Sequence, residues 1–147
     1  MAKWKVLFVC VHNSARSLMA ETSLRRWGGE DFEVDSAGLS PGSPNPLVVE
    51  VMKDWGVDLS GRKGQSVFEL YKAGRLYDFV ISVCDESAAE RCPVFPGITQ
   101  RIHWSFEDPS AFEGTWEEKL EHTRSLRDRI SGRVRDWVEE IRSRSVG

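Results

Sequence analysis

The stretch KVLFVCVHNSARSLMAE, residues 5–21, decides the fold of this chain. Residues 5–9 are mostly apolar, which is typical of a strand buried on both faces of a parallel sheet. A short polar loop follows, and residues 14–27 carry apolar side chains near helical spacing until Gly28 and Gly29 end the pattern. The stretch therefore predicts a strand, a loop and a helix, with Cys10 where the strand ends.

The rest of the chain repeats this alternation of strands and helices. Further strands are predicted over residues 32–36, 77–83 and 98–104, and further helices over residues 45–55, 67–73 and 115–143. Strands that alternate with helices indicate an α/β fold. We therefore expect a single domain, residues 1–147, in which a mostly parallel four-stranded sheet is flanked by helices.

The composition of the 147 residues narrows the classes of protein that fit. Hydrophobic residues make up 40% and charged residues 29%, a balance typical of globular domains. The net charge of −3 gives no general attraction to nucleic acid, and no apolar run approaches the roughly 20 residues that a membrane-spanning helix needs. The first residues lack the apolar region of a signal peptide. We expect a cytoplasmic monomer that binds neither nucleic acid nor membranes.

Cys10 is predicted to lie at the edge of the sheet where open parallel sheets bind their ligands. The loop that follows, with the start of the next helix, presents backbone N–H groups to an anion. Arg16 adds a fork of donors that suits two oxygens of a tetrahedral oxyanion, and this positive environment favours the thiolate form of Cys10. Ser17 can donate a hydrogen bond to that thiolate. The predicted oxyanion-binding loop comprises Val11, His12, Asn13, Ser14, Ala15, Arg16 and Ser17.

The residues VCVHNSARSLMAE, 9–21, resemble the active-site loop of low-molecular-weight protein tyrosine phosphatases and of the thioredoxin-coupled arsenate reductases that share their fold. The resemblance continues through SAG at 36–38, NP at 45–46 and HWSFEDP at 103–109, and so covers nearly the whole chain. It implies the low-molecular-weight phosphatase fold, with Cys10 as the nucleophile and Arg16 as an oxyanion ligand. It also implies that Asn13 braces the loop, often with a left-handed backbone, which asparagine tolerates better than most residues.

Asp108 precedes Pro109 in the last of these motifs. Phosphatase chemistry needs a carboxylic acid that protonates the leaving group and later activates water. Asp-Pro is also a common turn pair, so a purely structural role is the alternative. The resemblance favours Asp108 as the general acid and base, with Glu107 as a weaker candidate that is expected at the surface.

Cys84 and Cys92 add two thiols to the one that precedes the loop. Cys84 follows the predicted strand 77–83, so in a parallel sheet it shares an edge with Cys10. Seven residues, DESAAER, separate it from Cys92 and are predicted to form a loose helical turn that rearranges easily. Three interpretations of the two cysteines are open. They are inert side chains that fill space in the core, ligands of a zinc ion, or two members of a thiol relay. The zinc site fits poorly, because the spacing is long and no histidine lies nearby.

The resemblance to the arsenate reductases implies a relay of three thiols. Cys10 attacks arsenate, Cys84 displaces arsenite and forms a disulfide with Cys10, and Cys92 then moves that disulfide to Cys84–Cys92. External thioredoxin reduces it, and no cofactor is bound. Two rivals stay open: a phosphatase that acts on a phosphate ester through Cys10, Arg16 and Asp108, and a thiol-based redox or arsenite sensor that is not an enzyme.

The same family includes a potassium site made of Asn, Glu, Ser and Asp side chains. Asn13, Glu21 and Ser36 match that set, but Gln65 stands where the aspartate is expected, so we predict no bound metal. Gln65 closes the polar loop SGRKGQ. Arg62 and Lys63 in this loop fit the rim of the pocket as one alternative, but we expect the loop to be solvated, with Arg62 in water.

Overall fold

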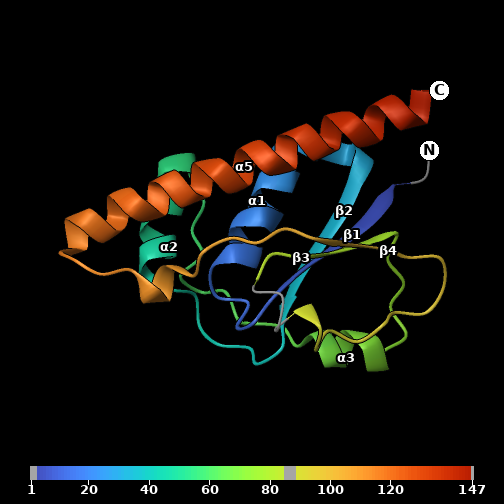
Figure 1. Cartoon of the computed structure of the whole chain (residues 1–147), viewed down its shortest axis with the longest axis horizontal. Coiled ribbons are helices and arrows are strands. Elements are labelled where there is room, and N and C mark those ends of the chain that lie inside the picture. Colours follow the sequence, from blue (N-terminus) through green and yellow to red (C-terminus); the bar gives the residue numbers. More distant parts are fainter. Residues whose placement is uncertain (1–2, 85–88, 147) are drawn as a thin grey trace.

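The computed structural model describes residues 3–84 and 89–146 and shows one sheet flanked by helices (Figure 1). The sheet has four parallel strands in the order β2-β1-β3-β4. The strands are β1 (Trp4–Cys10), β2 (Phe32–Gly38), β3 (Phe79–Ser82) and β4 (Gln100–His103). The helices are α1 (Arg16–Gly28), α2 (Pro46–Met52), α3 (Val67–Lys72) and α5 (Trp116–Val146). The predicted α/β fold is confirmed.

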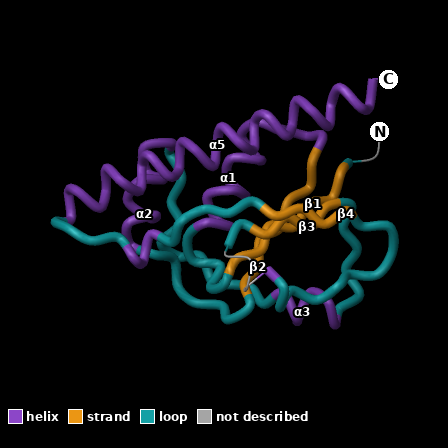
Figure 2. The backbone as a smooth tube through the Cα atoms, viewed as in Figure 1, coloured by secondary structure: helices purple, strands orange, loops and turns teal. Residues whose placement is uncertain are grey.

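The central strand β1 lies in the middle of the hydrophobic core. Each side chain from Val6 to Cys10 is at most 3% exposed, as expected of a parallel strand with both faces covered. Figures 1 and 2 show α1 and α5 on one side of the sheet and α3 on the other. The buried stripe of α5 includes Leu126, Ile130 and Val134, and this helix packs along α1 and α2. No helix in the described part of the chain is long and apolar enough to cross a membrane.

The register of the sheet brings the ends of three strands to one edge. Cys10, the last residue of β1, lies opposite Gly38, the last residue of β2. On the other side of β1, the N–H of Val83 donates to the carbonyl oxygen of Val9 (2.9 Å), one residue beyond the end of β3. Cys84 therefore follows at the same edge as Cys10, as the sequence predicted.

Gly38 ends β2 directly against the loop that follows β1. A Cβ atom on residue 38 would lie 2.6 Å from the backbone nitrogen of Asn13 and 2.8 Å from the carbonyl oxygen of Val11. Backbone atoms cannot swing aside as the tip of a side chain can, so this close approach requires glycine. The N–H of Gly38 also donates to the carbonyl oxygen of Gln65 (2.8 Å), which joins a third segment to the same edge.

Replacing Gly38 by alanine should lower the free energy of unfolding by roughly 1–3 kcal/mol, because the loop must move to admit the methyl group. Urea denaturation followed by tryptophan fluorescence measures the change. Gly61→Ala is the matched control, since no described atom lies within 4 Å of the Cβ position there. Equal stability of the two variants would contradict the close approach at Gly38.

Candidate active site

The loop after β1 is held in place through its carbonyl groups. Four of them accept hydrogen bonds from backbone N–H groups of the segment that follows β2. These bonds run from Leu39 to Cys10 (3.1 Å), from Ser40 to Val11 (2.7 Å), from Gly42 to His12 (2.9 Å) and from Asn45 to Ser14 (2.8 Å). In a trans peptide the C=O and the next N–H point in opposite directions. The N–H groups of the loop are therefore turned away from this segment and can bind an anion on the other side.

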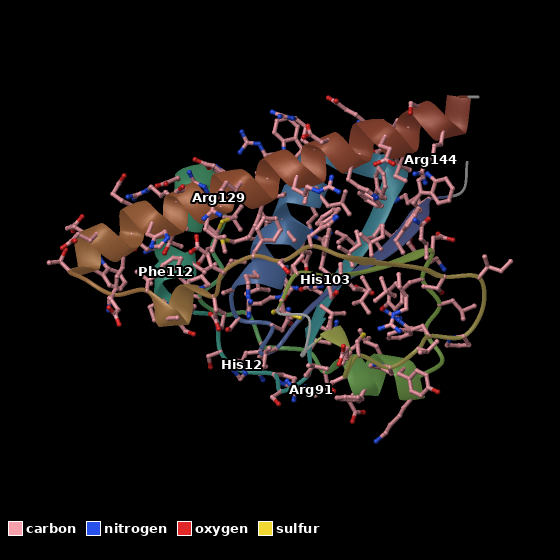
Figure 3. The ribbon with its side chains drawn as sticks, viewed as in Figure 1. His12, Arg91, His103, Phe112, Arg129 and Arg144 are labelled. Carbon is pink, nitrogen blue, oxygen red and sulfur yellow. The ribbon has the colours of Figure 1, made fainter. Side chains whose placement is uncertain are left out.

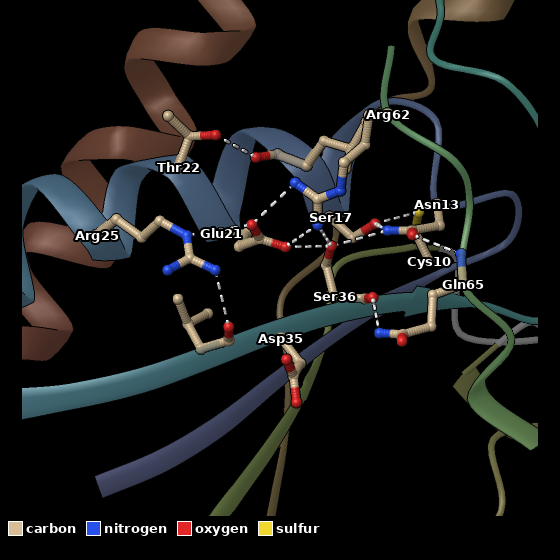
Figure 4. A network of polar contacts seen from close by, with 12 residues as sticks. Cys10, Asn13, Ser17, Glu21, Thr22, Arg25, Asp35, Ser36, Arg62 and Gln65 are labelled. Carbon is tan, nitrogen blue, oxygen red and sulfur yellow. Dashed lines mark hydrogen bonds and ion pairs between the residues drawn. The ribbon is translucent and has the colours of Figure 1, made fainter. Parts of the chain in front are cut away.

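Asn13 braces the loop from inside. It is buried and has a left-handed backbone (φ 51°), as the resemblance implied. Its side-chain oxygen accepts a hydrogen bond from the N–H of Gln65 (3.0 Å). Its Nδ2 group donates to the hydroxyls of Ser17 (2.8 Å) and Ser36 (2.9 Å), as Figure 4 shows. One amide side chain thus ties the loop to α1, to β2 and to the segment before α3.

Cys10 is 3% exposed, and its Sγ lies 2.9 Å from the Oγ of Ser17 in the first turn of α1. Ala15 precedes this helix, and its methyl group cannot cap the first N–H groups. The positive end of the helix is therefore available to the sulfur and to an anion. His12 is exposed, with its Nδ1 3.0 Å from the carbonyl oxygen of Ser40, and lies at the lower edge of the molecule in Figure 3. It contributes its backbone to the loop, whereas its ring faces outward.

Arg16 is 3% exposed and lies against the segment that contains Asp108. Its NH1 donates to the carbonyl oxygen of Phe106 (3.0 Å), and its NH2 lies 3.6 Å from Oδ2 of Asp108. Its Nε is buried and has no partner among the described residues, so one donor remains for an incoming oxyanion. The other oxygen of Asp108 accepts from the N–H of Ser110 (3.0 Å) at the start of the turn Pro109–Ala111. Asp108 therefore stabilises a turn and also lies beside Arg16.

Glu107 points away from the site and anchors the segment that carries Asp108 to α5. Its Oε1 lies 3.2 Å from Nε2 of His122 and accepts a hydrogen bond from Arg129. The hydrogen bond from Arg129 holds the pKa of Glu107 below its usual value. The ring of Phe112 stacks on His122 (3.6 Å between centroids), and Figure 3 shows Phe112 near the same helix. Glu107 is thus a surface residue, as expected, with a structural role.

The thiols of Cys84 and Cys92 are both buried. Cys84 follows β3 at the edge shared with Cys10, and Cys92 lies close to the carbonyl oxygen of Pro93 (Sγ···O 3.6 Å). Burial raises the pKa of Cys92, and the positive charge of Arg101 opposes this only in part. Residues 85–88, within the helical turn predicted between the two cysteines, lie outside the described residues.

The pairing of a buried carboxylate behind the loop with Arg62 is the feature that the sequence did not reveal. Glu21 is 2% exposed, and Arg62 donates two hydrogen bonds to it, from NH2 to Oε1 (2.6 Å) and from NH1 to Oε2 (3.0 Å). The expectation that Arg62 lies in water is wrong, because a buried charge requires a charged partner and this loop supplies it. Ser36 donates to the same carboxylate (2.6 Å). Within residues 3–84 and 89–146, no three acidic, histidine or cysteine side chains gather as they would around a metal ion.

Other proteins are similar to this chain in sequence and in fold. Residues 5–146 match the family described as low molecular weight phosphotyrosine protein phosphatase. An arsenate reductase of Halalkalibacterium halodurans is 38% identical over 141 residues, which cover 95% of this chain and 98% of that protein. The structure of a thioredoxin-dependent arsenate reductase of Corynebacterium glutamicum is similar (TM-score 0.69, 30% identity); the match covers 95% of this chain but only 62% of that one. A low-molecular-weight protein tyrosine phosphatase of T. tengcongensis is similar too (TM-score 0.72, 25% identity, 94% and 99% covered).

The charge on Glu21 should make stability depend on pH. Burial acts to raise the pKa of Glu21, but the hydrogen bonds from Arg62 and Ser36 and the charges of Arg62 and Arg25 outweigh it and hold the pKa below 4.5. The unfolded chain therefore takes up this proton first as the pH falls. The stabilisation is complete above about pH 5 and is lost as the pH drops below 4.5 through the folded value.

Urea denaturation between pH 7 and pH 3 should accordingly show a smaller loss of stability for Glu21→Gln than for the wild type. Glu107→Gln is the control, because Glu107 is an exposed carboxylate with a lowered pKa, and its ion pairs contribute little to stability. Parallel pH profiles for the wild type and Glu21→Gln would contradict the depressed pKa of Glu21.

Proposed function

The chain belongs to the low-molecular-weight phosphotyrosine protein phosphatase family, and we propose that it is an arsenate reductase that uses three cysteines in relay and thioredoxin as its reductant. One observation carries the proposal. Cys84 lies at the edge of the sheet where β1 delivers Cys10 to an oxyanion-binding loop. A phosphatase needs only the first of these thiols. Relatives that are named arsenate reductase support the choice of substrate.

Arsenate is a tetrahedral oxyanion that suits the loop after β1. The backbone N–H groups of residues 11–16 and the guanidinium of Arg16 surround its oxygens and offset its negative charge. The buried Nε of Arg16 is a donor that such an oxygen satisfies. The sulfur of Cys10 then lies beneath the central arsenic atom.

The first chemical step forms a bond between the thiolate of Cys10 and arsenic. The hydroxyl of Ser17, 2.9 Å from the sulfur, stabilises the thiolate before the attack. One oxygen of arsenate leaves as water, and Asp108, which lies beside Arg16 and is partly open to solvent, supplies the proton that it needs. Arsenic remains As(V) in the adduct.

The second step transfers two electrons. The thiolate of Cys84 attacks the sulfur of Cys10, the S–As bond breaks, and its electron pair stays on arsenic. Arsenic leaves as arsenite, As(III), while the two sulfurs form a disulfide. Phosphorus is not reduced in this way, and a phosphoryl-cysteine is instead hydrolysed by water. A second thiol at this position is therefore useful with arsenate and has no role in the hydrolysis of a phosphate ester.

The third step regenerates Cys10. Cys92 attacks Cys84, Cys10 leaves as a thiolate, and the disulfide moves to Cys84–Cys92, where the dithiol of thioredoxin reduces it. Burial raises the pKa of Cys92 and so disfavours its thiolate in this position. All three thiols belong to one chain, so a monomer suffices. The relay needs reduced thiols, which the cytoplasm maintains.

Phosphate ester hydrolysis is the second candidate function. The Arg16–Asp108 pair favours it, because an oxyanion ligand beside a carboxylic acid serves a phosphoryl-cysteine mechanism equally well. In that case Cys84 and Cys92 take no part in turnover. A thiol-based sensor, the non-enzymatic alternative, would bind arsenite in stoichiometric amount and turn over neither substrate.

Cys92→Ser separates the first two steps from the third. With reduced thioredoxin, the variant should release close to one arsenite per chain and then stop, whereas the wild type continues. Measuring arsenite against time, with the free thiols counted at the end, gives the result. Two thiols should be lost per chain in the single round.

Cys84→Ser is the companion variant, since it should block arsenite release in the first round while the arsenate site stays intact. Full arsenate turnover by both serine variants would rule out the relay. Turnover of an aryl phosphate, together with no arsenite from the wild type, would establish the phosphatase instead.

A further inference from the structure

We propose that Arg62 is a positioning residue that activates Cys10 from a distance, by keeping the buried Glu21 ionised and so fixing the direction of the hydrogen-bond chain that ends at the sulfur. The proposal rests on the proposed function in one respect, which is that Cys10 is the nucleophile. Its basis is the network drawn in Figure 4, which runs from α1 through β2 and back to the loop.

The chain of hydrogen bonds begins at the carboxylate of Glu21, which in its ionised form can only accept hydrogen bonds. The hydroxyl of Ser36 lies 2.6 Å from Oε1 and must therefore use its single proton toward Glu21. The oxygen of Ser36 is then left to accept, and Nδ2 of Asn13 donates to it (2.9 Å). The amide of Asn13 cannot turn over, because its oxygen accepts from the N–H of Gln65 (3.0 Å).

The second proton of Nδ2 sets the direction of the last bonds. Nδ2 of Asn13 donates to Oγ of Ser17 (2.8 Å), so the hydroxyl of Ser17 accepts there. The proton of Ser17 is then free to point at Sγ of Cys10, 2.9 Å away. A donor aimed at this sulfur favours the thiolate over the thiol. The negative charge on Glu21 and the N–H of Gln65 thus favour the same arrangement of two hydroxyls and one amide, in which the sulfur receives a hydrogen bond.

Arg62 is the cation that keeps this charge in place. Burial disfavours an ionised carboxylate, and Glu21 is 2% exposed. Arg62 offsets this penalty with two hydrogen bonds of 2.6 Å and 3.0 Å, from a side chain that is 35% exposed. If Glu21 took up a proton, its hydroxyl could donate to Ser36, and only the N–H of Gln65 would then hold the amide of Asn13 in the orientation that the later bonds require.

Arg25 provides a matched control within the same site. It also contacts Glu21, by a single bond of 3.2 Å from Nε, and its side chain is 60% exposed. The two arginines thus place the same charge on the same carboxylate, but Arg62 does so through two hydrogen bonds and with a less exposed side chain (35%). A charge farther from Glu21 is that of Asp35 on β2, which pairs with Arg75 (3.4 Å).

The position of Arg62 follows from its loop. Leu59 is buried, and the N–H of Arg62 donates to its carbonyl oxygen (3.0 Å), which turns the chain toward α1. A Cβ atom at Gly64 would lie 2.6 Å from the carbonyl oxygen of Gly42, so this loop packs on the segment that holds the oxyanion loop. The packing of this loop therefore holds Arg62 beside Glu21.

The test is the rate at which iodoacetamide alkylates Cys10, followed by mass spectrometry of the peptide that contains it. Arg62→Met should slow alkylation at pH 7 roughly tenfold, the effect of losing one hydrogen bond to a charged sulfur, and should leave the rate at pH 10 nearly unchanged. Arg25→Met should change the rate at pH 7 less than about twofold. Arg62→Lys should retain most of it, because an ammonium can still pair with Glu21.

Chemical rescue separates a role of charge from a general loss of structure. In Arg62→Ala, guanidinium chloride at tens of millimolar should restore the alkylation rate, and the same concentration of sodium chloride should not. Equal rates for the wild type and Arg62→Met, or equal losses in the two methionine variants, would overturn the proposal, as would the failure of guanidinium to act. Arsenate, Cys84 and Cys92 play no part in this measurement, so its outcome is independent of whether the chain reduces arsenate.

Discussion

The site depends on one set of backbone contacts, in which the segment after β2 takes up the carbonyl groups of the loop after β1. A loop that is free in solution would turn both its N–H and its C=O groups to water. Here four carbonyls are occupied, from Cys10 to Ser14, and the N–H groups are left on one side. The glycine at position 38 permits this contact, because any side chain there would collide with the backbone of the loop. Hydrogen bonds that do not involve the anion thus orient the N–H groups that bind it.

Charge is distributed around this loop in two separate pairs. Arg16 lies beside Asp108 at the site itself, and Arg62 lies on Glu21 behind it. The first pair is loose (3.6 Å) and partly open, so an oxyanion can compete for the guanidinium. The second is short (2.6 Å) and joined by two hydrogen bonds, although its exposed member, Arg62 (35%), is as open to solvent as Asp108 in the first pair (36%). The difference in geometry matches the proposed roles, because the first pair must respond to substrate and the second must not.

The position of the segments that form the site follows largely from sequence patterns, whereas the contact between Arg62 and Glu21 does not. Cys10, its loop and Arg16 form one continuous strand–loop–helix unit, so their arrangement follows from local patterns. Cys84 was placed at the right edge because the ends of parallel strands coincide. Arg62 was assigned to water because it stands in a polar loop, 41 residues from a carboxylate whose burial no local pattern reveals. Asp108 fitted both a turn and an acid, and its position is compatible with both.

The central claim is that Cys10 and Cys84 act together on arsenate, and the location of the disulfide after one turnover tests it most directly. One equivalent of arsenate is added to the fully reduced protein without thioredoxin, remaining thiols are blocked, and the disulfide-linked peptides are identified by mass spectrometry. The account predicts a Cys84–Cys92 disulfide in the wild type and a Cys10–Cys84 disulfide in Cys92→Ser, each with one arsenite released. Three unmodified thiols and no arsenite, in a protein whose Cys10 still reacts with iodoacetamide, would contradict it.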